Sequence, residues 1–373
     1  MEIQVHGGGV AGSAAAILLA RAGHRVSQHV ARDSRRQVPP EILSPWSLTL
    51  LDRLGLPSPE QAERCGGVLS LWGEDEPDFH DYVMTTTRCG LAANRSSFQR
   101  ELGAAARAAG VVQVEARARG AAVPVVDREE GAYHLLANGR SSPSPRRLED
   151  RLVAMFMPCE DDRSSDRLMI EAVEDGWWYL PPQAGATRFA VLVTDREAMA
   201  VQEESRGEWL RSSLGRTNLI AAAAGAIDAD LVAGVDARVA TAETAVWPSG
   251  ARLGDSAIAL DPLSGTGIAR ALEGASVITT EIVEYGRAGP AYRAWLENTH
   301  AEEVAIRTSI YARATERFQG APFWSRRMSR MMESRSGRAN VRFGSRLPLT
   351  SRRGTAERSQ LATFDQTPDG FGK

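Results

Sequence analysis

Two glycine-rich segments have the residue types and spacing to bind a phosphate or a flat ring against bare backbone. The first, residues 7–12 (GGGVAG), has the spacing GxGxxG and follows a short apolar run. In such a turn Gly7 permits the tight bend, Gly9 lets a diphosphate approach the backbone, and Gly12 lets the next helix pack closely. That helix would offer free N–H groups and its positive dipole end to the phosphates. The start of the chain therefore predicts a dinucleotide site.

The second segment is residues 254–268, GDSAIALDPLSGTGI. Asp255 can accept hydrogen bonds from a ribityl hydroxyl. The N–H groups of residues 265–268 can face a flavin ring or a diphosphate, because glycines keep side chains out of the way. The helix that begins there would also stabilise an anionic reduced flavin through its dipole.

The elements around the first segment follow the pattern strand, glycine turn, helix, strand. We expect residues 2–5 to form a short strand with Ile3 and Val5 on one face, and residues 13–22 to form a helix of small residues. Gly23 would end that helix before a second strand at residues 24–30. No positively charged stretch precedes the apolar run, which argues against a signal peptide. The pattern predicts the start of a Rossmann-like α/β fold.

One expected residue is missing from this pattern. A dinucleotide fold places an acidic side chain at the end of the second strand, where it binds the ribose hydroxyls. That position falls on Val30, and Asp33 could replace it only if the strand end is displaced. The sequence therefore predicts dinucleotide binding of reduced affinity.

Composition excludes several classes of protein. The 373 residues are 43% apolar and 24% charged, as in soluble globular proteins, and the net charge of −3 argues against a general nucleic-acid binder. The sequence contains no run of eighteen apolar residues, so no membrane-spanning helix is expected. Cys65, Cys89 and Cys159 are widely spaced without a CxxC pair, and the six histidines form no HExxH, so neither a disulfide framework nor a metal centre is expected. This cysteine usage fits a reducing cytoplasm.

In its motifs and their order, the chain resembles flavoprotein monooxygenases of the para-hydroxybenzoate hydroxylase type. Within these it is most similar to the halogenase-related branch. The matching segments span most of residues 1–330: GGGVAG, QVPPEIL followed by LLDRLGL, SLWG with HDY, NRSSFQREL, DGWWYLPP ending in VLVTD, GDSAIALDPLSGTGIARAL, and ERFQGAPFWSRR. That branch contains flavin-dependent halogenases. It also contains the monooxygenases that hydroxylate a tryptophan while cysteine tryptophylquinone is built in amine dehydrogenases and oxidases.

The resemblance implies FAD as the cofactor. The residues that it assigns to the cofactor site are Gly7, Gly9, Gly12, Arg36, Arg95, Asp255, Pro262, Gly265, Gly267 and Ile268. The sequence departs from the family pattern in four places: Val30 stands where the family has Glu, Arg36 where an acidic residue is usual, Val38 where it has Leu, and residues 136–140 (LANGR) where the family has DATGR. These departures concern the affinity for FAD and leave the fold expectation unchanged.

The predicted fold is α/β, with an inserted antiparallel sheet and a helical C-terminal part. The predicted FAD-binding Rossmann-like domain is discontinuous and comprises residues 1–66, 88–150 and 245–285, and the substrate domain comprises residues 67–87 and 151–240. Residues 286–330 are predicted to be helical and residues 331–373 to form a basic, partly irregular tail. Within these domains we expect a helix with its first turn at Pro40 or Glu41, a hairpin that includes residues 133–136, and a long helical segment over roughly residues 276–317.

Lysine usage bears on the reaction. Flavin halogenases of the resembled branch relay the oxidised halide through an active-site lysine amine, but the only lysine here is the last residue, Lys373. Hydroxylation needs no protein nucleophile, because the reduced flavin activates oxygen and the protein supplies a dry, shaped pocket. We therefore predict an FAD-dependent monooxygenase that hydroxylates an aromatic group, for which a peptidyl tryptophan in quinone-cofactor biogenesis is one candidate. A flavin-dependent dehydrogenase or reductase acting on a lipid or polyketide, and a degenerate flavoprotein that serves as a binding module, remain alternatives.

Aromatic residues of the inserted sheet are the candidates for the substrate pocket. Trp177, Trp178 and Tyr179 lie on one predicted strand, so their side chains alternate between its faces, and core packing is an equally good interpretation of each. His80 could assist acid–base chemistry, although a structural pair with Asp81 is the simpler interpretation. We also expect a substrate cleft that is open to a peptide or protein. The expected electron donor is NAD(P)H or a separate reductase.

Overall fold

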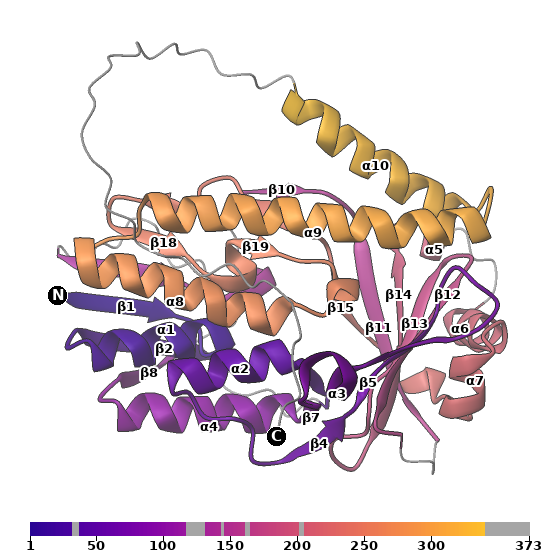
Figure 1. Cartoon of the computed structure of the whole chain (residues 1–373), viewed down its shortest axis with the longest axis horizontal. Coiled ribbons are helices and arrows are strands. Elements are labelled where there is room, and N and C mark those ends of the chain that lie inside the picture. Colours follow the sequence, from indigo (N-terminus) through magenta and orange to yellow (C-terminus); the bar gives the residue numbers. More distant parts are fainter. Residues whose placement is uncertain (32–36, 117–130, 143–144, 161–164, 201–204, 340–373) are drawn as a thin grey trace, which may run out of the picture.

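The computed structural model describes residues 1–31, 37–116, 131–142, 145–160, 165–200 and 205–339. Two large β-sheets stand side by side, and helices pack on both, with the long C-terminal helices running along one side of the molecule (Figure 1). This architecture confirms the predicted α/β fold with an additional antiparallel sheet and C-terminal helices. The domain boundaries drawn from the sequence stay a prediction.

The first sheet has the strand order β17-β18-β9-β1-β2-β8, and all its neighbours are parallel except β17 and β18. Its strands are β1 (Glu2–His6), β2 (Arg25–Ala31), β8 (Val112–Ala116), β9 (Ala132–Leu136), β17 (Val246–Trp247) and β18 (Gly250–Arg252). Ile3 and Val5 of β1 are fully buried in the same apolar cluster as Ile17 and Leu19 of helix α1 (Val10–Arg21). Helices α4 (Arg95–Ala108) and α8 (Gly267–Tyr285) pack against α1. Helix α1 therefore packs between the first sheet and the helices α4 and α8.

The second sheet has the order β15-β11-β14-β13-β12-β5-β6 and is antiparallel except for the pair β5 and β12. Its strands are β5 (Gly67–Leu71), β6 (Asp78–Asp81), β11 (Leu152–Cys159), β12 (Arg167–Val173), β13 (Gly176–Leu180), β14 (Arg188–Asp195) and β15 (Ala233–Asp236). Every residue of β14 is buried, because the sheet is covered on both faces. One face packs against α9 (Pro290–Arg317) and α10 (Pro322–Ala339), and the other against α6 (Arg206–Gly215) and α7 (Leu219–Ala224).

Helix α9 is the element that joins the two sheets (Figure 1). Near its start, the Tyr292 hydroxyl donates to the Arg252 carbonyl of β18, at 2.8 Å. Near its end, the Ile310 carbonyl accepts a hydrogen bond from the Trp72 indole, which follows β5, at 2.7 Å. The Glu281 carboxylate accepts hydrogen bonds from three backbone N–H groups at the start of α9, which satisfies donors that have no partner within the helix. Contacts to both sheets therefore hold α9 along its length.

Short elements complete the described part of the chain. Two small sheets have the orders β10-β16-β19 and β3-β7-β4. Their strands are β3 (Glu41–Leu43), β4 (Ala62–Cys65), β7 (Gly90–Ala93), β10 (Arg146–Leu148), β16 (Ala240–Ala242) and β19 (Ile258–Ala259). The remaining helices are α2 (Pro45–Leu54), α3 (Tyr82–Thr86) and α5 (Arg196–Ala200), with the 3₁₀ turns η1 (Gly139–Ser141), η2 (Ala229–Leu231), η3 (Gly254–Ser256) and η4 (Pro262–Ser264).

Three sequence expectations about elements are wrong. Glu41 lies in strand β3, and the helix begins at Pro45, because the Ser44 hydroxyl caps it by accepting the Ser47 N–H. Strand β9 is no hairpin strand but pairs in parallel with both β1 and β18 inside the first sheet. The segment expected as one long helix is divided into α8 and α9, because Gly286 adopts a left-handed conformation, with φ of 71°, that ends α8.

Candidate functional site

The glycines of the first motif divide into two that the fold requires and one that leaves open space. Gly7 has φ of 137°, and a Cβ there would lie 2.2 Å from the Ala137 carbonyl oxygen. A Cβ at Gly12 would lie 2.3 Å from the carbonyl oxygen of Gly7. Gly9, which precedes α1, has no atom within 4 Å of an added Cβ, and no side chain caps the helix there. A ligand can therefore approach the first turn of α1 at Gly9.

The second motif builds a similar open helix start. Asp261 accepts the Leu263 N–H at 3.0 Å and so shapes the turn η4, and Gly265 follows with φ of 61°. Gly265 and Gly267 have no atom within 4 Å of an added Cβ. Thr266 precedes α8 but does not cap it, because its hydroxyl donates instead to the Glu303 carboxylate at 2.7 Å. The first turn of α8 therefore also lacks a side-chain cap and has open space at its glycines.

Several other helices of the described chain have acceptors at their N-termini. Asn94 caps α4, Ser205 caps α6, and the buried carboxylates of Glu171 and Glu281 cap α7 and α9. The helices α1 and α8 lack such a side-chain cap in the described residues, and they pack against each other. Their open N-termini provide N–H donors and positive dipole ends suited to phosphates or to a ring that becomes anionic.

The Gly254-Asp255 turn lies against the first turn of α1. A Cβ at Gly254 would lie 2.8 Å from the Cβ of Ala11, so the two motifs that are distant in sequence meet in space. The Asp255 carboxylate forms an ion pair with Arg140 at 3.1 Å, and about 41% of its side chain is exposed. Arg140 also donates to the carbonyls of Arg238 and Leu260, which fixes the guanidinium and orients the carboxylate. Asp255 is thus a fixed acceptor beside the open start of α1.

The end of strand β2 is apolar, as the sequence indicates. Val30 lies in β2, and its Cγ1 atom would be 1.9 Å from a Cβ at Gly8, so this side chain contacts the glycine turn directly. Glu115 of β8 is in register beside Val30 and provides a carboxylate on the next strand. Arg95 is the first residue of α4 and forms an ion pair with Glu41 at 3.2 Å. Arg36 and Lys373 lie outside the described residues.

The three aromatic substrate candidates separate onto two faces of β13. Trp178 is fully buried against α6, where its indole donates to the Ser213 hydroxyl at 3.1 Å. Trp177 is 1% exposed and packs on the other face, at the centre of an aromatic cluster with Trp72, Tyr311, Phe323 and Trp324. Both tryptophans are therefore core residues in this structure.

Tyr179 lies on the same face as Trp177 and is only half-buried. Val38, which precedes β3, and Leu263, which precedes α8, pack against the same apolar cluster as Tyr179. Burial and the neighbouring charge of Glu41 raise the pKa of Tyr179, so the phenol stays protonated. Of the three aromatic candidates, Tyr179 is the one that is only partly buried.

His80 is an exposed residue of the edge strand β6. Its ring packs edge-to-face on Tyr82, with the centroids 5.7 Å apart. The expected pair with Asp81 is not formed, because the Asp81 carboxylate accepts the backbone N–H groups of Val83 and Met84 and so caps α3. His80 therefore has a surface position without the predicted carboxylate partner.

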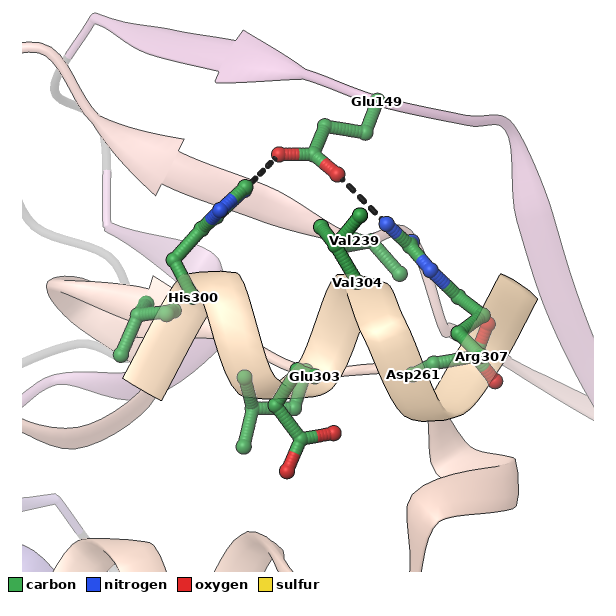
Figure 2. A pocket seen from close by; sticks show the side chains of 9 residues that line it. Glu149, Val239, Asp261, His300, Glu303, Val304 and Arg307 are labelled. Carbon is green, nitrogen blue, oxygen red and sulfur yellow. Dashed lines mark hydrogen bonds and ion pairs between the residues drawn. The ribbon is translucent and has the colours of Figure 1, made fainter. Parts of the chain in front are cut away.

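A buried cluster of charged side chains lies behind the second motif, and no spacing in the sequence predicts it. Figure 2 shows His300 and Arg307 of α9 reaching the carboxylate of Glu149 from two sides, Arg307 at 2.7 Å. Burial opposes ionisation of Glu149, but hydrogen bonds and charges from His300 and Arg307 outweigh it and lower its pKa to about 2. A cavity of about 10 Å³, large enough for one water molecule, adjoins this cluster.

A larger cavity of about 250 Å³ opens at the edge of the second sheet. Its lining residues are Leu152, Val153, Arg196, Gly234, Val235, Asp236 and Arg238. Neither of these two cavities is lined by residues 177–179, so the expected open cleft at the tryptophan strand stays a prediction. No helix in the described residues has the length and apolar character to cross a membrane.

Known proteins with similar sequence or structure agree with this geometry. No family model matches the chain. A curated relative, "Putative FAD-dependent oxidoreductase LodB" of Marinomonas mediterranea, is 26% identical over 365 residues, covering 87% of this chain and 95% of LodB. CmlS, a flavin-dependent halogenase, superposes with a TM-score of 0.74 at 22% identity over 90% of this chain and 70% of its own. The chain has the fold of flavin-dependent halogenases and monooxygenases.

A second solved structure points to the other part of the same branch. QhpG, a peptidyl tryptophan dihydroxylase essential for tryptophylquinone cofactor biogenesis, superposes with a TM-score of 0.71 at 23% identity, over 87% of this chain and 78% of QhpG. The resemblance drawn from the sequence motifs is thereby confirmed. Likeness at this level of identity establishes the fold.

Proposed function

We propose that the chain is an FAD-dependent oxidoreductase whose cofactor lies across the open N-termini of α1 and α8. The observation that carries this proposal is the pair of packed helices whose first turns lack side-chain caps and are flanked by Gly9, Gly265 and Gly267, with open space at each glycine. Two separated phosphate- or ring-binding helix ends suit a flavin dinucleotide better than a mononucleotide. The curated relative LodB and the structural neighbour CmlS are flavin enzymes by name, which supports the same assignment.

The residues present fit FAD at the diphosphate and flavin ends and fit it less well at the adenosine end. Gly9 and the first turn of α1 would hold the diphosphate, and Asp255 would accept from the ribityl chain. Residues 262–268 would border the ring, where the α8 dipole favours negative charge. Val30 offers no acceptor to the adenosine ribose, and Glu115 on the next strand is the carboxylate in register with it.

For the reaction, we propose oxygen insertion into an aromatic group, with a peptidyl tryptophan as the leading substrate class. A bound reduced flavin supplies activated oxygen, and the chain itself must then exclude water and orient the acceptor. Tyr179, Val38 and Leu263 pack against one apolar cluster and offer apolar surface for that purpose, and Leu263 belongs to the second motif. Hydroxylation is favoured over halogenation because the only lysine of the chain is its last residue. The name of QhpG supports the substrate class.

A dehydrogenase or reductase on a lipid or polyketide is a second candidate, because the fold does not fix the chemistry. A binding module without turnover is a third, and Val30 is the observation that favours it, since weak FAD binding would leave the chain without its cofactor.

The test combines cofactor binding with product analysis. The purified protein is incubated with FAD, desalted, and its visible spectrum recorded; a retained flavin spectrum is expected. The loaded protein is then reduced with NAD(P)H or a flavin reductase and exposed to oxygen, bromide and a tryptophan-containing peptide. Mass spectrometry is expected to find added oxygen on the peptide. A brominated peptide would contradict the hydroxylase proposal, and a protein that never retains FAD would contradict both enzyme candidates.

A further inference from the structure

Residues 261–267, here called the cofactor loop, are held from behind by the C-terminal helices. We propose that Tyr311 of α9 and Arg327 of α10 are positioning residues that fix the cofactor loop relative to the second sheet. The inference rests on the proposed function, because it assigns these two side chains to the flavin-binding site. Neither residue belongs to a glycine motif, and Arg327 follows Asp261 by 66 positions in the sequence.

Asp261 is the point at which the helices hold the loop. Its Oδ2 atom accepts the Tyr311 hydroxyl at 2.6 Å and the Arg327 guanidinium at 3.3 Å. Its Oδ1 atom accepts the Leu263 N–H, and its carbonyl accepts the Ser264 N–H at 3.1 Å. One carboxylate therefore links the buried helices to the turn that precedes Gly265. A shift of Asp261 would move the backbone N–H groups of the cofactor loop with it.

Arg327 connects this point to the place where the chain crosses between the sheets. Its guanidinium also donates to Asp150 at 3.2 Å, and the side chains of both residues are about 3% exposed. Asp150 in turn accepts the N–H groups of Leu152, the first residue of β11, and of Val239, shortly after β15. Asp150 thus ties together the strands that enter and leave the second sheet. Through Arg327, the position of that sheet is coupled to the cofactor loop.

Aromatic packing restricts the movement of the Arg327 guanidinium between Asp150 and Asp261. It lies over the rings of Tyr311 and Phe323, at 4.8 and 5.6 Å from their centroids. A planar cation held between two aromatic rings has little freedom to rotate. Burial in this charged surrounding also keeps Tyr311 protonated, because burial and the Asp261 charge raise its pKa. The Tyr311 hydroxyl is therefore a permanent donor to Asp261.

A second contact holds the other end of the loop. Thr266 donates to Glu303 at 2.7 Å, and Glu303 lies about two turns before Tyr311 on α9. Both ends of the cofactor loop are thus attached to one helix, and that helix is itself attached to both sheets. This arrangement predicts that α9 sets the loop's shape before any ligand binds.

The matched pair Tyr311→Phe and Tyr292→Phe tests the proposal. Both tyrosines are fully buried on α9, and each hydroxyl donates one hydrogen bond, Tyr292 to the Arg252 carbonyl and Tyr311 to Asp261. In Tyr311→Phe the Asp261 carboxylate keeps Arg327, so the fold should survive. Both variants lose one buried hydrogen bond, but only the bond lost in Tyr311→Phe is made to the cofactor loop.

Hydrogen exchange of the FAD-free proteins is measured first, followed by FAD titration. We expect amide exchange in residues 261–267 to accelerate about tenfold in Tyr311→Phe and to stay unchanged in Tyr292→Phe. We expect FAD to bind Tyr311→Phe about tenfold more weakly, with an altered flavin absorption band. Arg327→Lys, which keeps the charge but has a shorter side chain and no planar guanidinium to pack on Tyr311 and Phe323, should show the same accelerated exchange.

The outcomes separate the two proposals. Equal exchange and equal FAD affinity in the two tyrosine variants would overturn the positioning role, whatever the wild type binds. If the wild type shows no FAD binding, the proposed function fails, while the exchange experiment still reports whether Tyr311 holds the loop. Unchanged exchange of the loop in Arg327→Lys would exclude Arg327 from the proposal.

Discussion

Replacing Gly9 by glutamate should separate folding from cofactor binding. Gly9 has φ of −77° and ψ of −179°, an extended conformation that any residue adopts, and an added Cβ meets no atom within 4 Å. A carboxylate before α1 interacts favourably with the helix dipole, by about 0.3–1 kcal/mol. The free energy of unfolding of FAD-free Gly9→Glu should therefore stay within about 1 kcal/mol of wild type.

The same carboxylate would occupy the space through which a diphosphate reaches the backbone. If it displaces two N–H hydrogen bonds to phosphate, each worth about 1.5–3 kcal/mol, at least about 3 kcal/mol of binding free energy is lost. That corresponds to a dissociation constant raised roughly 100-fold or more, before charge repulsion is added.

The assay is titration of FAD by quenching of flavin fluorescence, beside urea unfolding of the FAD-free proteins. Gly215→Glu is the control, because Gly215 in α6 also has no atom within 4 Å of an added Cβ. It should bind FAD as the wild type does. Gly12→Ala provides the contrast: its Cβ would lie 2.3 Å from the Gly7 carbonyl oxygen, so the fold itself should be destabilised. A folded Gly9→Glu that binds FAD with unchanged affinity would refute the assignment of α1 to the diphosphate.

Three further predictions concern single residues. Val30→Glu should tighten FAD binding by about 1–3 kcal/mol by restoring an acceptor for the ribose, measured by the same titration; no gain in a folded variant would mean that another residue, such as Glu115, already holds it. His6 should contribute to acid unfolding, because burial and the neighbouring His29 and His134 lower its pKa from 6.5 to about 4. Since the unfolded chain binds this proton more readily, up to about 3 kcal/mol of stability present above pH 6.5 should be lost as the pH falls toward 4. His6→Gln should lose less stability over that range in urea titrations, and an identical pH dependence would contradict the prediction. Lys373→Ala should give the same oxygenated product as wild type in the peptide assay, whereas a bromination activity that disappears with this lysine would show that it relays halide.

The sequence alone determined the features that depend on local backbone geometry. The glycines at positions 7, 9 and 12 follow from sterics within a few residues, so their spacing predicts a strand, a tight turn and a helix start without knowledge of the rest of the chain. The motif at residues 254–268 likewise predicts its own turn and helix. Val30 shows the same principle, because a missing acidic side chain can be read directly from its position in the strand.

Only the tertiary structure decided which distant segments meet. Alternation along β13 separates Trp177 from Trp178, but the helices packed on each face determined that both would be core residues. Strand β9 looked like part of a hairpin because its neighbours in sequence are polar loops, whereas its partners β1 and β18 lie more than a hundred residues away along the chain.

The cluster of Asp150, Asp261, Tyr311 and Arg327 was equally beyond sequence reasoning. Each residue is an unremarkable polar side chain in its own segment, and no local spacing relates them. They form a cluster because burial forces charged groups to find partners, and the fold brings those partners from four separate segments of the chain. Local sterics thus determined the glycine turns at the site, and the pairing of buried charges determined what holds one of them in place.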